Sequence, residues 1–206
     1  DMGAGKGYLT FALYDYLHNK LKKKPKVLGI ELRSELVEKC NAIVEKAKFD
    51  HLSFEQGAIK EVVLPKIDVL MALHACDIAT DDAIARGIKD HAKVILAAPC
   101  CHKQIRNSMK NQGSLAALTK FGIMEARQAE ILTDTIRALI LESYGYKTKV
   151  FEFIATDHTP KNILIAAVKT KEIEVPDPII KEQITTLKET FGISFHELER
   201  LMEIKN

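Results

Sequence analysis

The chain has 206 residues, of which 47% are hydrophobic and 28% are charged. This composition excludes a disordered or fibrous chain and suits one domain with a sizeable core and a small appendage. No apolar run reaches the roughly 20 residues of a membrane-spanning helix, and no segment resembles a signal peptide, so we expect a cytoplasmic protein with no membrane partner. The formal net charge of +2 is too small to require a nucleic-acid partner and does not exclude one.

The first seven residues, Asp-Met-Gly-Ala-Gly-Lys-Gly, form a glycine-rich run of the kind that connects a strand to a helix. Such a turn normally follows a buried strand, whereas this chain starts at Asp1, inside the turn itself. We therefore expect an upstream N-terminal segment of the same protein to supply that strand. Leucines then recur every four residues from Leu9 to Leu21, which predicts an amphipathic helix.

Strands and helices alternate in the next hundred residues. Short apolar runs predict strands at 27–31, 51–56, 67–74 and 93–99. Helical spacing begins at Ser34 and again at Thr80. This alternation indicates βαβ units and a parallel sheet that is covered on both faces.

The remaining residues predict a long helix, two strands and a pair of short helices. The long helix covers 124–144, and the strands at 146–155 and 162–169 could pair as an antiparallel hairpin. Two prolines mark a linker at 172–178, and the last short helix opens with the capping box of residues 194–197. We expect a domain at 1–170, followed by a linker and helical extension at 171–206.

The glycine run is a candidate nucleotide-like cofactor site. Its glycines, Gly3, Gly5 and Gly7, let backbone N–H groups approach a ligand, but such spacing alone is weak evidence. Glu31 ends the next strand, 24 residues after Gly7, where an acid can accept hydrogen bonds from both ribose hydroxyls. The alternative is an acid that is merely solvated at a strand end.

Unusual chemistry follows two later strands. The first ends in Leu-His-Ala-Cys-Asp, residues 73–77, and the second in Pro-Cys-Cys-His, residues 99–102. Ligands of doubly wound sheets bind at the carboxyl ends of the strands, and consecutive strands are usually neighbours. These side chains are therefore expected to converge on one site.

Together these motifs resemble class I S-adenosylmethionine (SAM) dependent methyltransferases, and within them a group of uncharacterised putative methyltransferases with Leu-His-x-Cys and Cys-Cys strand ends. The resemblance covers about residues 1–170, including 133–137 and 158–162. It implies a Rossmann-like doubly wound α/β sheet of order 3-2-1-4-5-7-6 with a truncated first strand. It also implies SAM as cofactor. The implied cofactor-binding residues are Asp1, Gly3, Gly5, Gly7, Glu31, Gln56, Gly57 and Ala58.

Three functional interpretations of the histidine and cysteine cluster stay open. In the favoured one, His74, Asp77 and His102 orient a methyl acceptor and remove its proton. In the second, the cluster's histidines and cysteines bind zinc, although no Cys-x2-Cys pair is present and the groups sit on rigid strand ends. In the third, Cys100 attacks a pyrimidine covalently. Buried, reduced thiols are the plain alternative. We accordingly predict His74, Asp77, Cys100 and His102 as catalytic residues and no metal ligand.

The methyl acceptor is not encoded in any motif. RNA is the preferred acceptor class, by analogy alone, and the lack of an Asn-Pro-Pro-Tyr or Asp-Pro-Pro-Tyr tetrapeptide disfavours N6-adenine methylation. The rivals are a noncatalytic SAM-fold module that binds a partner and an NAD-dependent enzyme. A lysine run at 20–26 suits a solvated helix end, with phosphate contact as the alternative. On the long helix, Arg127, Asp134 and Arg137 could face the pocket, but the spacing of Glu130, Asp134 and Arg137 slightly favours ion pairs on the helix surface.

Overall fold

The computed structural model describes residues 1–73, 75–110, 113–153 and 161–203. Six strands form two sheets. The strands are β1 (Val27–Glu31), β2 (Leu52–Gln56), β3 (Val69–Leu73), β4 (Val94–Ala98), β5 (Tyr146–Glu152) and β6 (Ile163–Lys169). β1 and β2 pair in parallel, and the other four strands form a sheet in the order β3-β4-β6-β5, in which β6 is antiparallel to both neighbours.

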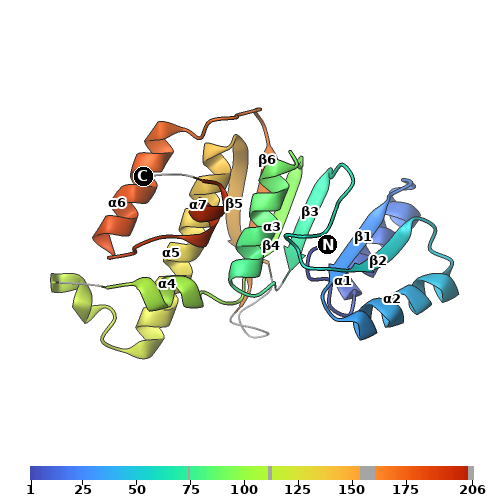
Figure 1. The fold of residues 1–206 in the computed structure, drawn as a ribbon, viewed down its shortest axis with the longest axis horizontal. Coiled ribbons are helices and arrows are strands. Elements are labelled where there is room, and N and C mark those ends of the chain that lie inside the picture. Colours follow the sequence, from blue (N-terminus) through green and yellow to red (C-terminus); the bar gives the residue numbers. More distant parts are fainter. Residues whose placement is uncertain (74, 111–112, 154–160, 204–206) are drawn as a thin grey trace.

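The two sheets meet at the second residue of the chain. Met2 forms a parallel bridge with Ile30 of β1, and its N–H donates to the carbonyl of Met71 in β3 at 2.8 Å. Asp1 and Met2 thus occupy the position of a strand between β1 and β3 (Figure 1). The strand sequence is β2-β1-(residues 1–2)-β3-β4-β6-β5, which confirms the predicted order with its short first strand.

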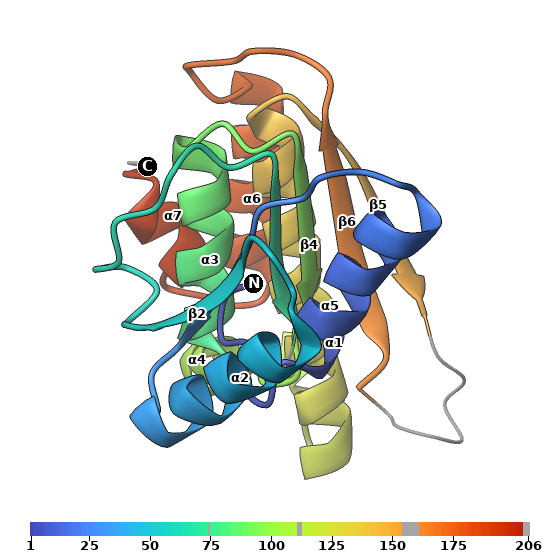
Figure 2. The same ribbon diagram turned by 90° about the vertical axis from the view of Figure 1, so that its right-hand side faces the viewer.

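Helices lie on both sides of this arrangement. They are α1 (Tyr8–Asp15), α2 (Ser34–Ala47), α3 (Ile78–Lys89), α4 (Lys103–Ser108), α5 (Gly122–Ser143), α6 (Pro178–Thr190) and α7 (Glu197–Leu201), with a π-helical turn at Tyr16–Lys20 and a 3₁₀ turn at Gly113–Ala117. α3, α6 and α7 lie on one side of the larger sheet and α1 on the other (Figure 2). None of the helices in the described part of the chain is long and apolar enough to cross a membrane.

The leucine pattern of the first helix predicted the wrong buried face. Leu9 and Leu21 are about half exposed, whereas Thr10 and Tyr14 are buried. The Thr10 hydroxyl donates to the carboxylate of Asp1, and the Tyr14 hydroxyl donates to a backbone carbonyl before β2. These two polar side chains are satisfied internally, which a search for apolar spacing does not detect.

The C-terminal helices pack on the same core as the sheet. Ile184 of α6 and Leu198 of α7 belong to the buried cluster that contains Ile95 and Ile165 of the central strands. The capping box at 194–197 is not formed. Instead the ring Nδ1 of His196 accepts the N–H of Leu198 at 3.1 Å and caps α7. The division of the chain at residue 170 stays a prediction.

Candidate active site

The glycine loop runs beneath the carboxyl end of β1. The N–H groups of Gly3 and Ala4 both donate to the Ile30 carbonyl at 2.9 Å, which fixes the loop against the strand. Gly3, Gly5 and Gly7 have φ angles of 76°, 59° and 72°, in the left-handed region that favours glycine. The loop conformation therefore needs all three glycines, and its last one begins α1.

The space beside each glycine differs. A Cβ added at Gly3 would meet only Ala75 at 3.8 Å, and one at Gly5 would meet only a carbonyl oxygen at 4.0 Å. A Cβ at Gly7 would lie 2.9 Å from the ring of Phe54 and 3.0 Å from that of Phe11. Packing thus accounts for Gly7, while the open surface lies at Gly3 and Gly5, where a ligand could approach the backbone. A cofactor contact at Gly7 stays a prediction.

Glu31 is the charged group of this half of the site. Its side chain is almost fully buried, and its Oε2 accepts the N–H of Gly5 at 2.8 Å. Its Oε1 accepts from the backbone N–H and the Nε of Arg33, at 3.2 and 2.8 Å. Burial alone would raise the pKa of Glu31, but these hydrogen bonds and the charge of Arg33 outweigh burial and lower it. The carboxylate is therefore ionised and tied directly to the glycine loop.

The end of β2 lies beside Glu31. Gln56 is the register partner of Glu31, and the N–H of Gly57 donates to the Glu31 carbonyl at 3.1 Å. The side chain of Gln56 donates to the Leu32 carbonyl, and the Ala58 carbonyl caps the turn that follows. The structure thus brings the predicted cofactor-binding residues of the glycine loop, the end of β1 and the end of β2 into one region. Their contact with a cofactor stays a prediction.

Three cysteines form the other half of the site. The sulfurs of Cys76 and Cys100 are 3.7 Å apart, those of Cys100 and Cys101 3.8 Å, and those of Cys101 and Cys76 3.9 Å. They come from the loops after β3 and β4, as the strand ends predicted. Ala75 precedes Cys76, and a Cβ added at Gly3 would lie 3.8 Å from the Ala75 side chain, so the loop that carries Cys76 runs beside the glycine loop. His74, which was predicted to be catalytic, lies outside the described residues.

Cys100 has the most perturbed thiol. Burial, together with the neighbouring thiols of Cys76 and Cys101, raises its pKa to about 12. The thiolate, and not the thiol, is the attacking form of cysteine. A Cys100 thiol with a raised pKa is thus poorly suited to attack a pyrimidine, and the covalent interpretation loses support.

His102 is held by a buried network of charges. Its Nε2 lies 3.2 Å from Asp134, and the other carboxylate oxygen of Asp134 accepts from Arg137 at 3.0 Å. Arg137 also donates two hydrogen bonds to Asp81 of α3, at 2.8 and 3.0 Å. The sequence had indicated ion pairs on a helix surface, and this interpretation is wrong, because Arg137 is 0% and Asp134 5% exposed. Glu130 pairs instead with Lys161.

The same arginine reaches the loop after β3. Its Nη2 donates to the backbone carbonyl of Asp77 at 3.0 Å. Asp77 has a φ of 47°, which is unusual for a residue with a side chain, at the residue that begins α3. Arg137 of α5 therefore fixes both loops that carry the predicted catalytic residues. The sequence offered a pocket-facing Arg137 only as the less favoured alternative, although residues 133–137 are part of the family resemblance.

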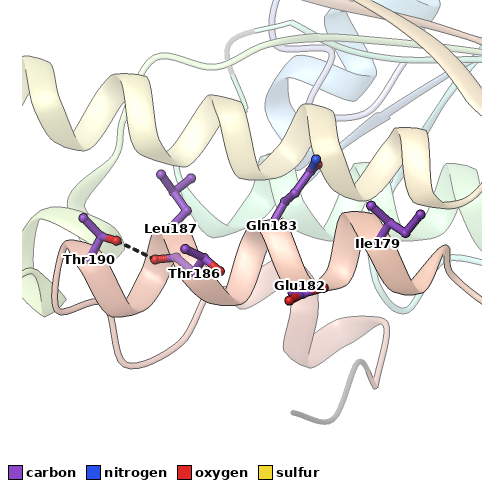
Figure 3. A pocket seen from close by; sticks show the side chains of 6 residues that line it. All are labelled: Ile179, Glu182, Gln183, Thr186, Leu187 and Thr190. Atoms are coloured by element: carbon purple, nitrogen blue, oxygen red, sulfur yellow. Dashed lines mark hydrogen bonds between the residues drawn. The ribbon is translucent and has the colours of Figure 1, made fainter.

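A shallow hollow of about 380 Å³ lies elsewhere, on α6 where it faces α5. It is lined by Ile179, Glu182, Gln183, Thr186, Leu187 and Thr190 (Figure 3). It contains one carboxylate and lies on α6, which Figure 1 shows at the other end of the molecule from β1 and β2. We do not assign it to the active site.

Solved structures share this fold. The chain has a TM-score of 0.53 to an rRNA methylase from Streptococcus thermophilus, with 12% identity over 83% of this chain and 85% of the methylase. The methyltransferase domain of bacterial CtHen1-C gives a TM-score of 0.52, with 13% identity over 82% and 87%. WbdD has a TM-score of 0.46 and 14% identity over 81% of this chain, which spans only 34% of WbdD. The fold is the Rossmann-like fold of class I SAM-dependent methyltransferases.

The sequence itself gives the family. The Methyltransferase domain family matches residues 1–108, which include the glycine loop, Glu31 and all three clustered cysteines. The chain belongs to this family. None of the curated proteins compared with the chain matches it.

Proposed function

We propose that this methyltransferase-family chain transfers a methyl group from SAM to its acceptor. The observation that carries the proposal is the contact between the Glu31 carboxylate and the N–H of Gly5 at 2.8 Å, with the end of β2 alongside. The buried, ionised carboxylate suits ribose hydroxyls, and the open backbone at Gly3 and Gly5 suits the amino-acid end of the cofactor. When bound, SAM supplies the electrophilic methyl group.

The chain's own groups supply orientation and proton transfer. Asp134 holds the ring of His102 through Nε2, and Arg137 fixes the backbone from which the Asp77 side chain projects. Positioning of the acceptor and removal of its proton are the tasks that methyl transfer requires of such groups. These roles for Asp77 and His102 rest on their positions in the loops after the neighbouring strands β3 and β4.

Calorimetric titration with SAM tests the cofactor. Glu31→Ala removes charged hydrogen bonds worth about 1.5–3 kcal/mol, so SAM affinity is expected to fall by about 10- to 150-fold. Glu35→Ala, an exposed acid on the next helix, is the matched control and leaves affinity unchanged. Failure of the unmodified protein to bind SAM, or tighter binding of NAD, would overturn the proposal.

RNA is the proposed acceptor. The rRNA methylase with this fold supports RNA only by analogy. In the chain itself, five exposed lysines, at 20, 22, 23, 24 and 26, precede β1 and form a basic segment that could contact phosphates. They lie at the amino end of β1, whereas the cofactor site lies at its carboxyl end, so they would bind the acceptor away from the reacting atom.

Transfer of a tritiated methyl group from SAM to fractionated cell RNA, protein and small molecules tests the acceptor. RNA acceptance predicts label that ribonuclease releases. Replacement of Lys22, Lys23 and Lys24 by Gln should weaken RNA binding and reduce its logarithmic salt dependence by about 3, while SAM affinity stays the same. Label confined to protein or small molecules would exclude RNA without affecting the SAM assignment.

A further inference from the structure

The sulfur atoms of Cys76, Cys100 and Cys101 form a nearly equilateral triangle with sides of 3.7–3.9 Å. They come from two different loops, so the triangle exists only because β3 and β4 are neighbours in the sheet. All three ligand atoms lie within 4.8 Å of one another. The chain's fourth cysteine, Cys40, lies apart from them, buried against the glycine loop.

Packing in the core does not explain the triangle. Free cysteines that serve as small hydrophobic side chains are among the most buried residues, as Cys40 is at 2% exposure. Cys76, in contrast, is exposed, and Cys100 and Cys101 are only partly buried. Three thiols gathered at the surface, at the ligand-binding edge of an α/β sheet, have a chemical and not a packing reason to be together.

The size of the triangle matches a metal site. Zinc bound by thiolates in a tetrahedron has metal–sulfur bonds of about 2.3 Å, which sets the sulfur–sulfur edges at about 3.8 Å. We propose that Cys76, Cys100 and Cys101 bind a zinc ion. The sequence alone favoured no metal ligand here, because it shows no Cys-x2-Cys pair. The structure supplies the missing proximity by bringing Cys76 to the vicinal pair.

The ligand set selects the metal. Three sulfur ligands exclude magnesium and calcium, which bind oxygen. Iron–sulfur clusters are commonly held by four cysteines, whereas three lie together here within the described residues. Zinc accepts this set in tetrahedral geometry without redox chemistry.

Within the described residues, the three sulfurs fill three positions of the tetrahedron, and the fourth is left to a further ligand. Catalytic zinc sites keep that position for water or an incoming ligand, whereas structural sites are closed by four protein ligands. The loop of Cys76 runs beside the glycine loop, where a Cβ added at Gly3 would lie 3.8 Å from Ala75, so the ion would lie near the candidate cofactor site. The proposal itself does not depend on SAM.

Elemental analysis of the reduced, full protein after zinc loading and desalting tests the site. We expect about one equivalent of zinc, held through three sulfurs at about 2.3 Å and one lighter atom in X-ray absorption. Cys76→Ser should lower the affinity for zinc by more than about 100-fold, because loss of a direct ligand costs more than the usual change in the outer shell of a metal site. Cys100→Ser and Cys101→Ser should act alike. Cys40→Ser is the matched control and retains the full equivalent.

Cys76 is exposed, so its substitution should leave the folded state intact and keep the comparison valid. Circular dichroism of Cys76→Ser checks this point. Less than about a tenth of an equivalent of zinc in the reduced protein would overturn the proposal. So would retention of zinc by Cys76→Ser, or a stoichiometric content of iron or copper in place of zinc. A protein that binds no zinc and instead loses two hydrogens on mild oxidation would assign the triangle to a disulfide.

Discussion

Replacement of Arg137 by Met should destabilise the protein more than any substitution on its surface. Arg137 is fully buried and donates four hydrogen bonds, two to Asp81, one to Asp134 and one to the Asp77 carbonyl. Burial lowers the pKa of Arg137, but its two carboxylate partners outweigh burial and raise it, so the guanidinium stays charged. Met has a similar length and no charge, so the substitution isolates the loss of this cation.

The expected loss is about 3–5 kcal/mol in the free energy of unfolding, because two carboxylates then lie buried without their partner. Burial already raises the pKa of Asp81, with Arg137 offsetting only part of that effect, and the variant should raise it further. Asp81→Asn in the Arg137→Met background should restore part of the stability. Asp81→Asn alone completes the double-mutant cycle.

Denaturant unfolding followed by circular dichroism measures the loss. Arg106→Met is the control, since Arg106 forms a partly exposed pair with Glu125 and should cost less than about 1 kcal/mol. A loss below about 1 kcal/mol for Arg137→Met would refute the idea that the network holds α5 to the loops after β3 and β4. A loss equal to that of Arg106→Met would refute it as well.

Three further predictions concern stability. Burial lowers the pKa of His196 from 6.5 to about 3. Below pH 6.5 the unfolded chain is therefore protonated at His196 while the folded protein is not. The free energy of unfolding falls as the pH drops through this range, by up to about 1.4 kcal/mol per pH unit. His196→Asn keeps a helix cap and should reduce this pH dependence by the amount that corresponds to about one bound proton. An unchanged pH dependence would contradict the role assigned to His196. Gly29→Ala places a Cβ against the Phe54 ring and should lower the free energy of unfolding by at least about 1–3 kcal/mol. Thermal or denaturant unfolding measures this loss, and a neutral effect would show that the ring can move. Tyr146→Phe removes a buried hydrogen bond to the Ala92 carbonyl and should lower the free energy of unfolding by about 1–2 kcal/mol. An unchanged free energy of unfolding would disprove this prediction.

The parallel part of the sheet could be predicted from sequence because its strands are continuous apolar runs, as in residues 69–73 and 94–98. Glu31 and the glycines could be located because their chemistry is local to one βαβ unit. The buried face of α1 could not be predicted from sequence, because Thr10 and Tyr14 are buried through hydrogen bonds to distant segments. Apolar periodicity carries no information about such partners.

The candidate site shows the same division. The convergence of Cys76 with Cys100 follows from strand order, which the alternating pattern gave. The sulfur–sulfur distances that favour zinc depend on the conformations of two loops, which the sequence pattern does not predict. The sequence left the position of Arg137 open between pocket and surface, because the spacing of Asp134 and Arg137 is equally typical of a solvent-facing helix.

The ring of Phe54 occupies the space that side chains at Gly7 and Gly29 would fill. One aromatic side chain of β2 therefore limits the motion of the glycine loop. A smaller residue at Phe54 would leave the loop with more conformations to lose when a ligand binds. The affinity would then fall through entropy, with the binding contacts unchanged.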